Sequence, residues 1–88
     1  MKYRVVFSKQ VVKKLKKFDK PIKDMILTWL SAYVDGTENP RFYGKALSGD
    51  LKGSWRYRIG DYRVIASIDD GKVLILVVDV DHRSKIYK

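Results

Sequence analysis

The chain has 88 residues, 45% of them hydrophobic, and no cysteine. This length suits one small domain, 1–88, and the missing cysteines exclude disulfides and thiolate metal sites. The 19 Lys and Arg residues outnumber the 10 Asp and Glu residues, for a net charge of +9, which favours nucleic acid over a membrane surface as partner. No apolar run approaches the roughly 20 residues that span a bilayer, and no signal peptide is visible, so we expect a cytoplasmic protein.

The first third of the chain predicts a strand and a helical hairpin. Tyr3–Phe7 has the composition of a strand, and Ser8 is a good N-cap for the helix that follows. This helix carries its lysines around an apolar stripe, and we interpret them mainly as a solvated face. Pro21 lies near the first turn of a second, amphipathic helix that ends at Gly36. The very short link between the two helices predicts an antiparallel pair.

The segment Thr37–Gly53 shows no firm periodicity and is predicted to be a loop, with a short turn around Lys45–Leu47. A connection of this length without regular structure is often functional in a compact domain. Lys45 and Lys52 are therefore candidate RNA contacts, although exposed lysines are also common in loops that bind nothing.

An alternation of aromatic or aliphatic with cationic residues over Trp55–Ile59 predicts a half-buried strand. A tight turn at Gly60–Asp61 places Arg58 opposite Arg63. Arg56 then shares their face of the sheet, whereas Trp55, Tyr57, Val64 and Ala66 lie on the other face. Directly opposed like charges are unfavourable, so this register predicts a bound anion such as a phosphate.

Asp70–Gly71 predicts a second two-residue turn, which pairs Arg63 with Val78. The run Val73–Val78 is continuous in apolar residues, which is typical of a central strand covered on both faces. The expected fold class is α+β: an antiparallel β-meander plus the N-terminal strand, packed against the helical hairpin.

With this register, the segment after Val78 emerges beside the arginines. His82, Arg83 and Tyr87 are then expected to join Arg56, Arg58 and Arg63 around one concavity. His82 is the only histidine, and histidine is the side chain that ordinarily exchanges protons near neutral pH.

Three stretches together resemble the RelE/ParE superfamily of bacterial toxins, closest to its RelE branch: Lys45–Gly49, Leu51–Val64, and the ending His82–Arg83 followed by Tyr87. The resemblance covers nearly the whole chain. It implies a ribosome-dependent endoribonuclease that cuts messenger RNA in the ribosomal A site and is held inactive by a cognate RelB-like antitoxin. In such toxins the messenger's 2′-hydroxyl attacks the adjacent phosphate, and the reaction needs no metal or other cofactor.

The resemblance also implies roles for single residues. Arg56 and Arg58 match basic positions of RelE-type toxins, Arg63 matches the arginine that binds the scissile phosphate, and Tyr87 matches a tyrosine that orients the nucleotide. RelE has lysines at the first two of these positions, and arginine is a poor general base. Asp81 stands where RelE has another arginine. Our hypothesis is that His82 handles a proton while Arg63 and Arg83 stabilise charge.

Two other functions remain open. ParE-type toxins of the same superfamily poison DNA gyrase without cutting RNA, but they generally lack the full basic and histidine or tyrosine set at the C-terminal end. A non-catalytic, basic RNA-binding module is disfavoured because Trp55 and Tyr57 are predicted to face the core rather than to form a stacking surface. In either toxin, the antitoxin is expected to be acidic or amphipathic and to cover the basic concavity or displace the C-terminal segment.

Overall fold

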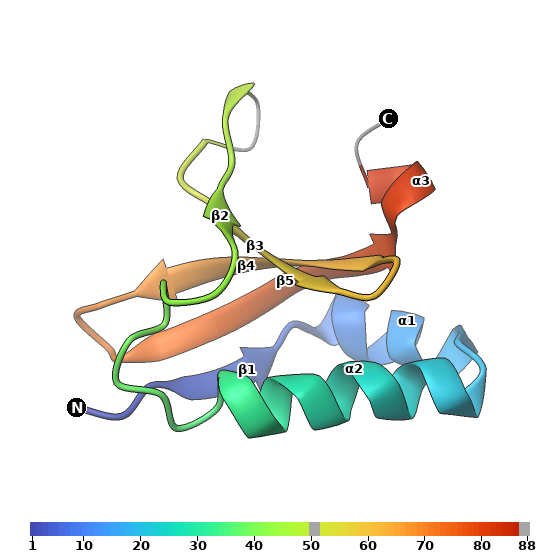
Figure 1. Ribbon diagram of the computed structural model, residues 1–88, viewed down its shortest axis with the longest axis horizontal. Coiled ribbons are helices and arrows are strands. Elements are labelled where there is room, and N and C mark those ends of the chain that lie inside the picture. Colours follow the sequence, from blue (N-terminus) through green and yellow to red (C-terminus); the bar gives the residue numbers. More distant parts are fainter. Residues whose placement is uncertain (50–51, 87–88) are drawn as a thin grey trace.

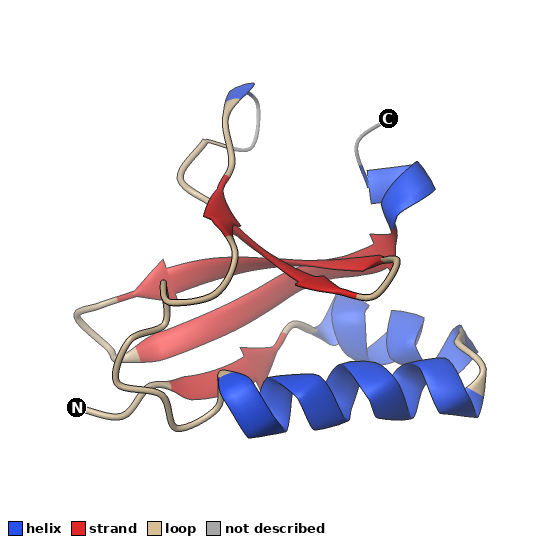
Figure 2. Ribbon diagram, in the orientation of Figure 1, coloured by secondary structure: helices blue, strands red, loops and turns tan. Residues whose placement is uncertain are grey.

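The computed structural model describes residues 1–49 and 52–86 and shows a sheet with two helices on one face (Figures 1 and 2). The elements in chain order are β1 (Arg4–Phe7), α1 (Lys9–Lys17), α2 (Lys20–Tyr33), β2 (Lys45–Ala46), β3 (Trp55–Ile59), β4 (Tyr62–Asp69), β5 (Leu74–His82) and α3 (Arg83–Ile86). No helix in the described part of the chain is both long and apolar enough to cross a bilayer.

The sheet has five strands in the order β1-β5-β4-β3-β2, with β1 parallel to β5 and the other pairs antiparallel. Helices α1 and α2 pack on one face, as the predicted α+β fold requires. The opposite face, called the uncovered face below, has no helix lying along it. Figure 1 shows β2 and α3 rising from opposite ends of this face. The uncovered face of the sheet therefore lies between these two elements.

Local signals account for both helices. Ser8 Oγ accepts a hydrogen bond from the Val11 N–H at the start of α1, at 3.2 Å, which satisfies one of the free donors of the first turn. Pro21 lies in the first turn of α2, where its missing N–H costs nothing. Beyond the end of α2, Gly36 has φ +83°, a conformation that other residues rarely adopt. The predicted hairpin is thus confirmed.

The core lies between the helices and the covered face of the sheet. Its fully buried side chains include Ile26 and Leu30 from α2 and Tyr57, Val64 and Val77 from the strands. Burying each aliphatic side chain of this size contributes about 1.5–3 kcal/mol. The Tyr57 hydroxyl donates a 2.5 Å hydrogen bond to the Pro40 carbonyl, and burial raises its pKa to about 12. Tyr57 therefore attaches the loop before β2 to the middle of the sheet.

The register between β3 and β4 is as predicted, with Arg58 opposite Arg63 and Arg56 opposite Ile65. The register between β4 and β5 was predicted wrongly. Asp69 pairs with Leu74, so the connection holds four residues rather than two, and a bulge between Ile65 and Ala66 shifts the pairing by one more. Arg63 consequently lies opposite Asp81 instead of Val78.

The longer connection has a local cause. Asp69 Oδ1 accepts a hydrogen bond from the Lys72 N–H at 3.0 Å, and Val73 adopts φ +55°, which completes a wider turn than the Asp70–Gly71 signal suggests. The observed register therefore differs from the predicted one by three residues in total, which is an odd number. Since side chains alternate between faces, every β5 residue beyond the bulge lies on the face opposite to the predicted one.

Three smaller predictions were also wrong. The turn expected around Lys45–Leu47 is instead strand β2, which pairs with Trp55 and Arg56. Strand β5 is not covered on both faces, because Leu76 is 38% exposed. The helix α3 was not foreseen.

Candidate functional site

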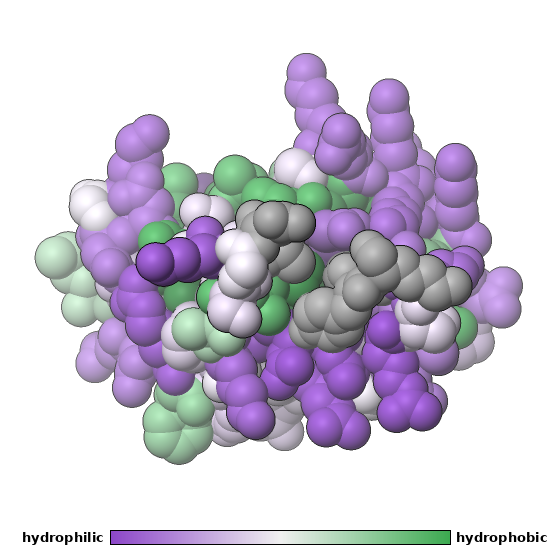
Figure 3. Space-filling model, turned by 90° about the horizontal axis from the view of Figure 1, so that it is seen from above, coloured by the Kyte–Doolittle hydropathy of each residue, from purple (hydrophilic) through white to green (hydrophobic). Residues whose placement is uncertain are grey.

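Three arginines from adjacent strands gather on the uncovered face and are called the arginine cluster: Arg56, Arg58 and Arg63. The β3–β4 pairing places all three on this face. Arg63 is only 9% exposed, whereas Arg58 is exposed. Figure 3, which views the molecule from this side, shows hydrophilic side chains over much of the surface, with the hydrophobic ones gathered in a narrower zone. The predicted concentration of guanidinium groups is therefore present.

The Arg63 guanidinium lacks internal compensation. Its Nε and Nη1 atoms are buried and have no hydrogen-bond partner among the described residues. Neither Arg58 nor Arg63 forms an ion pair with a carboxylate within 1–49 or 52–86. A buried cation with unsatisfied donors is costly, and such groups in native proteins call for an explanation such as a ligand. A bound phosphate oxygen is a suitable partner, because arginine presents its N–H groups in a fork that matches it.

Asp81 faces Arg63 across the β4–β5 pair but is bonded elsewhere. Lys14 Nζ, from α1, lies 2.8 Å from the Asp81 carboxylate and 2.9 Å from that of Asp79. Burial alone would raise the pKa of Asp81, but the hydrogen bond from Lys14 and the His82 N–H together lower it. Burial likewise opposes the charge of Lys14, yet the two aspartates raise its pKa. Lys14, interpreted from sequence as part of a solvated face, thus binds the carboxylate of the residue that pairs with Arg63.

Replacing Lys14 by Gln is expected to destabilise the fold at pH 7 but not in acid. The pKa of Asp81 lies below its ordinary value of 3.8 in the folded chain, so its contribution to stability is present above that value and is lost as the pH falls through the folded pKa. The free energies of unfolding of the two proteins, measured in urea, should differ at about pH 7 and converge by about pH 2. The control is Lys13→Gln, which removes the same charge from an exposed neighbour; an equal loss in both variants would argue against the specific pair.

His82 does not join the arginine cluster, contrary to prediction. The displaced register puts it opposite Tyr62 on the helix-covered face, and the two rings make an edge contact with centroids 5.4 Å apart. Its Nδ1 lies 2.9 Å from Ser84 Oγ and accepts the Ser84 N–H at 3.2 Å. The placement of His82 is therefore that of a residue that fixes the start of α3.

The remaining candidate residues have different placements. Arg83 donates its N–H to the Asp61 carbonyl at 2.8 Å, and its Nε is 3.9 Å from the Asp61 carboxylate, so it lies against the β3–β4 turn. Lys45 lies opposite Arg56 and extends the arginine cluster toward β2. Lys52 is exposed in a turn. Tyr87 lies outside the described residues.

Sequence reasoning missed a pocket at the outer edge of β3. Its volume is about 240 Å³, and it is lined by Trp29, Tyr43, Gly44, Lys45, Arg56 and Arg58. Two members of the arginine cluster therefore also border an aromatic surface. In the described part of the chain, no three His, Asp or Glu side chains form a group that could hold a metal ion.

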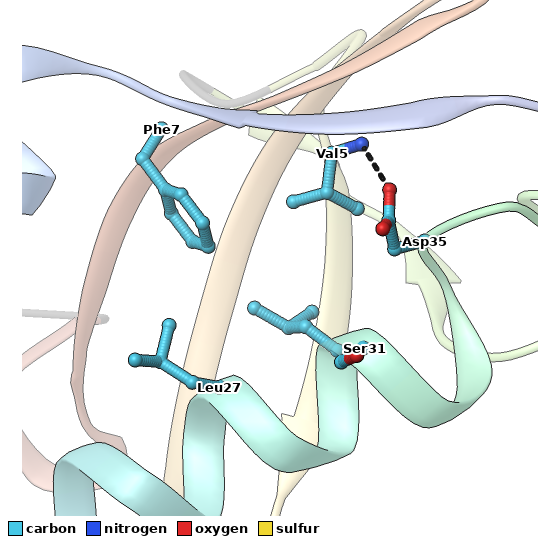
Figure 4. A pocket seen from close by; sticks show the side chains of 6 residues that line it. Val5, Phe7, Leu27, Ser31 and Asp35 are labelled. Carbon is cyan, nitrogen blue, oxygen red and sulfur yellow. Dashed lines mark hydrogen bonds between the residues drawn. The ribbon is translucent and has the colours of Figure 1, made fainter.

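A second pocket, of about 110 Å³, lies at the other edge of the sheet between β1 and α2. Figure 4 shows Val5 and Phe7 of β1 facing Leu27 of α2, with the Val5 N–H bonded to the Asp35 carboxylate at 3.0 Å. This hydrogen bond satisfies one outward-pointing donor of the edge strand. The pocket is mainly apolar, and it lies at the β1 edge of the sheet, whereas Lys45, Arg56 and Arg58 lie at the β2–β3 edge.

Comparison with known proteins identifies the family. A family profile described as ParE toxin of type II toxin-antitoxin system, parDE, matches residues 5–87. Toxin RelG of Mycobacterium tuberculosis is 32% identical over 88 residues, which is 100% of this chain and 99% of the relative. The chain belongs to the RelE/ParE superfamily of toxins.

Solved structures agree with this assignment. The toxin is similar to a chain of the toxin-antitoxin complex RelBE2 from M. tuberculosis, with a TM-score of 0.77 and 30% identity, covering 94% of this toxin and 100% of that chain. It is also similar to a chain of the archaeal RelE-RelB complex from Pyrococcus horikoshii, with a TM-score of 0.70 and 32% identity over 97% of this toxin and 99% of that chain. The predicted RelE-like fold is therefore confirmed.

Proposed function

We propose that this toxin is an endoribonuclease that cuts messenger RNA in the ribosomal A site and so stops translation. The observation that carries the proposal is the buried Arg63 guanidinium, whose Nε and Nη1 donors find no partner among the described residues, with Arg58 directly opposite. Two guanidinium groups held this close repel each other unless an anion lies between them. The phosphate of an RNA backbone is such an anion, and the resemblance to RelE-type toxins implies RNA as the polymer.

The proposed reaction needs charge stabilisation and positioning. The 2′-oxygen attacks the adjacent phosphorus as its proton leaves, the bond from phosphorus to the 5′-oxygen breaks, and that oxygen gains a proton. The products are a 2′,3′-cyclic phosphate and a free 5′-hydroxyl. Arg63 and Arg58 bind the phosphate oxygens and stabilise the extra negative charge of the transition state, and Arg83 supplies a further cation at the β3–β4 turn.

Proton transfer is not assigned to the arginine cluster, because arginine does not lose its proton in proteins. His82 lies on the opposite face, so the earlier hypothesis of proton transfer by His82 requires α3 to move from its observed position. The proposed site supplies cationic side chains but no side chain that accepts the 2′-hydroxyl proton. This would account for a need for the ribosome, whose RNA and bound messenger bring further groups to the phosphate.

The proposed partner that silences the toxin is a RelB-like antitoxin with an acidic, amphipathic segment. A groove of about 250 Å³ on the helical side has an apolar lining that includes Phe7, Leu15 and Leu27, and it is bordered by Lys16 and Lys23. Apolar side chains flanked by lysines match an amphipathic segment with acidic edges. The structural relatives named above are toxins in complexes with antitoxins.

Expression in bacterial cells followed by mapping of messenger 5′ ends tests the proposal. We expect new ends within codons occupied by ribosomes, and their loss with Arg63→Ala. Defects in DNA supercoiling with intact messenger would instead favour a gyrase poison, the second candidate, which the ParE description of the matching family supports. Normal growth with neither effect would leave a basic RNA-binding module.

A further inference from the structure

Four aromatic side chains form a connected surface beside the arginine cluster, called the aromatic shelf: Trp29, Tyr33, Phe42 and Tyr43. Tyr43 is central, with ring centroids 4.9 Å from Phe42, 5.5 Å from Tyr33 and 5.6 Å from Trp29. Phe42 is 70% exposed and Tyr33 is 50% exposed. Large aromatic side chains left this open do not contribute fully to the core, and such patches mark binding sites.

The shelf is held rigidly. Trp55 Nε1 donates a 2.7 Å hydrogen bond to the Tyr43 carbonyl. The next residue, Gly44, packs so closely on β3 that a Cβ atom would collide with the Arg56 carbonyl. On the other side, Arg41 makes two hydrogen bonds, of 3.1 and 3.0 Å, with the Asp70 carboxylate. Phe42 and Tyr43 are therefore presented by a backbone that is fixed on both sides, which lowers the entropy cost of binding a ligand.

The shelf borders a strongly cationic rim. The pocket at the outer edge of β3 is lined by Trp29 and Tyr43 and by three cations, Lys45, Arg56 and Arg58, and none of its lining residues within 1–49 and 52–86 carries a carboxylate. Arg58 belongs to both this pocket and the pair with Arg63. A chain that crosses from Arg63 over Arg58 therefore reaches the aromatic surface next.

We propose that the aromatic shelf and its cationic rim bind one nucleotide of single-stranded RNA, with the base stacked on the exposed Phe42 ring and the phosphate on Lys45 and Arg58. Tyr43 lies at 83° to Phe42 and would meet the base at its edge. Stacking on aromatic rings beside a positively charged groove is how proteins hold single strands. This subsite rests on the proposed function in that it takes a nucleotide next to the one cut at Arg63. An acidic peptide would also pair with cations through its carboxylates, but a nucleotide carries a phosphate and a planar base on one short unit, which matches cations beside an aromatic surface.

Binding of a fluorescein-labelled single-stranded RNA hexamer, followed by fluorescence anisotropy without ribosomes, tests the subsite. Phe42→Ala and Phe42→Leu are expected to weaken binding about 5- to 100-fold, the range expected for one stacked base, whereas Phe42→Tyr keeps a ring and should bind like the wild type. Val12→Ala, at another exposed apolar position, is the control. Since Phe42 is 70% exposed, these variants should fold, which circular dichroism checks.

Equal affinities for Phe42→Ala, Phe42→Leu and the wild type would overturn the subsite and leave binding by charge alone. Polyphosphate as competitor gives a second readout: it should displace the hexamer more readily from Phe42→Ala than from the wild type, and equal displacement would also contradict stacking. The assay scores no cleavage. If Phe42→Ala weakens binding but messenger stays intact in cells, the nuclease proposal alone is contradicted. If Phe42→Ala binds like the wild type but messenger is cut on ribosomes, the subsite alone is contradicted.

Discussion

The Arg63→Met variant is expected to lose messenger cleavage by about 100- to 1,000-fold while becoming more stable than the wild-type toxin by about 1–2 kcal/mol. Both effects have the same cause. The buried Nε and Nη1 donors of Arg63 have no partner among the described residues, so their desolvation destabilises the free protein, and a phosphate that reaches the guanidinium would supply the missing acceptors. Methionine fills similar space without donors, and it removes the binding group together with the desolvation cost.

Cleavage rates on programmed ribosomes and urea unfolding of the purified protein measure the two effects separately. Arg63→Lys should restore part of the activity, because it keeps the charge but not the fork. The matched control is Arg4→Met, since Arg4 is an exposed arginine in β1 opposite the start of β5. A loss of stability in Arg63→Met would mean that the guanidinium is structural, which contradicts a site kept open for an anion.

The Gly44→Ala variant is expected to lose about 3–5 kcal/mol of stability, a large share of what a domain of this size has. Gly44 has φ +87°, and an added Cβ would collide with the Arg56 carbonyl and lie 2.7 Å from Trp55 Nε1. Neither group can move away without a cost in free energy. The Arg56 carbonyl belongs to the backbone of β3, and Trp55 Nε1 is hydrogen-bonded to the Tyr43 carbonyl. The expected result is separation of β2 from β3 and loss of the aromatic shelf.

The Gly36→Ala variant measures the cost of the left-handed backbone conformation alone, without the collision that an added Cβ meets at Gly44. Gly36 has φ +83° with nothing within 4 Å of an added Cβ, so it should cost only the left-handed conformation, about 1–2 kcal/mol. Urea midpoints of both variants give the comparison. Equal losses of unfolding free energy in the two variants would show that the backbone at Gly44 moves away from β3 at no cost. The aromatic shelf would then not be held in place by this contact.

The sequence predicted the contacts that follow from a short, regular turn and missed those that depend on an irregular turn, a bulge or a side chain distant along the chain. The β3–β4 register follows from a two-residue turn at Gly60–Asp61, and it located the arginine cluster correctly. The β4–β5 register depends on the hydrogen bond that Asp69 accepts from the Lys72 N–H and on a bulge, and the Asp70–Gly71 signal predicts neither of them. The misplacement of His82 follows from that single error.

The ion pairs of Lys14 could not be predicted from the sequence, because they join residues that are far apart along the chain. Lys14 is 65 positions from Asp79 along the chain, and nothing local distinguishes it from its lysine neighbours. The aromatic shelf did carry a signal: Phe42 and Tyr43 are adjacent aromatics within a loop between Pro40 and Gly44. Such residues in a loop have no strand or helix to bury them, so their exposure was open to prediction.

Whether this toxin is a nuclease is decided by incubating it with purified ribosomes that carry a defined messenger. We expect a cut within the A-site codon, a downstream fragment with a 5′-hydroxyl end, and loss of the cut with Arg63→Ala but not with the control Arg4→Ala. An intact messenger, with DNA gyrase inhibited by the same preparation, would contradict the nuclease proposal.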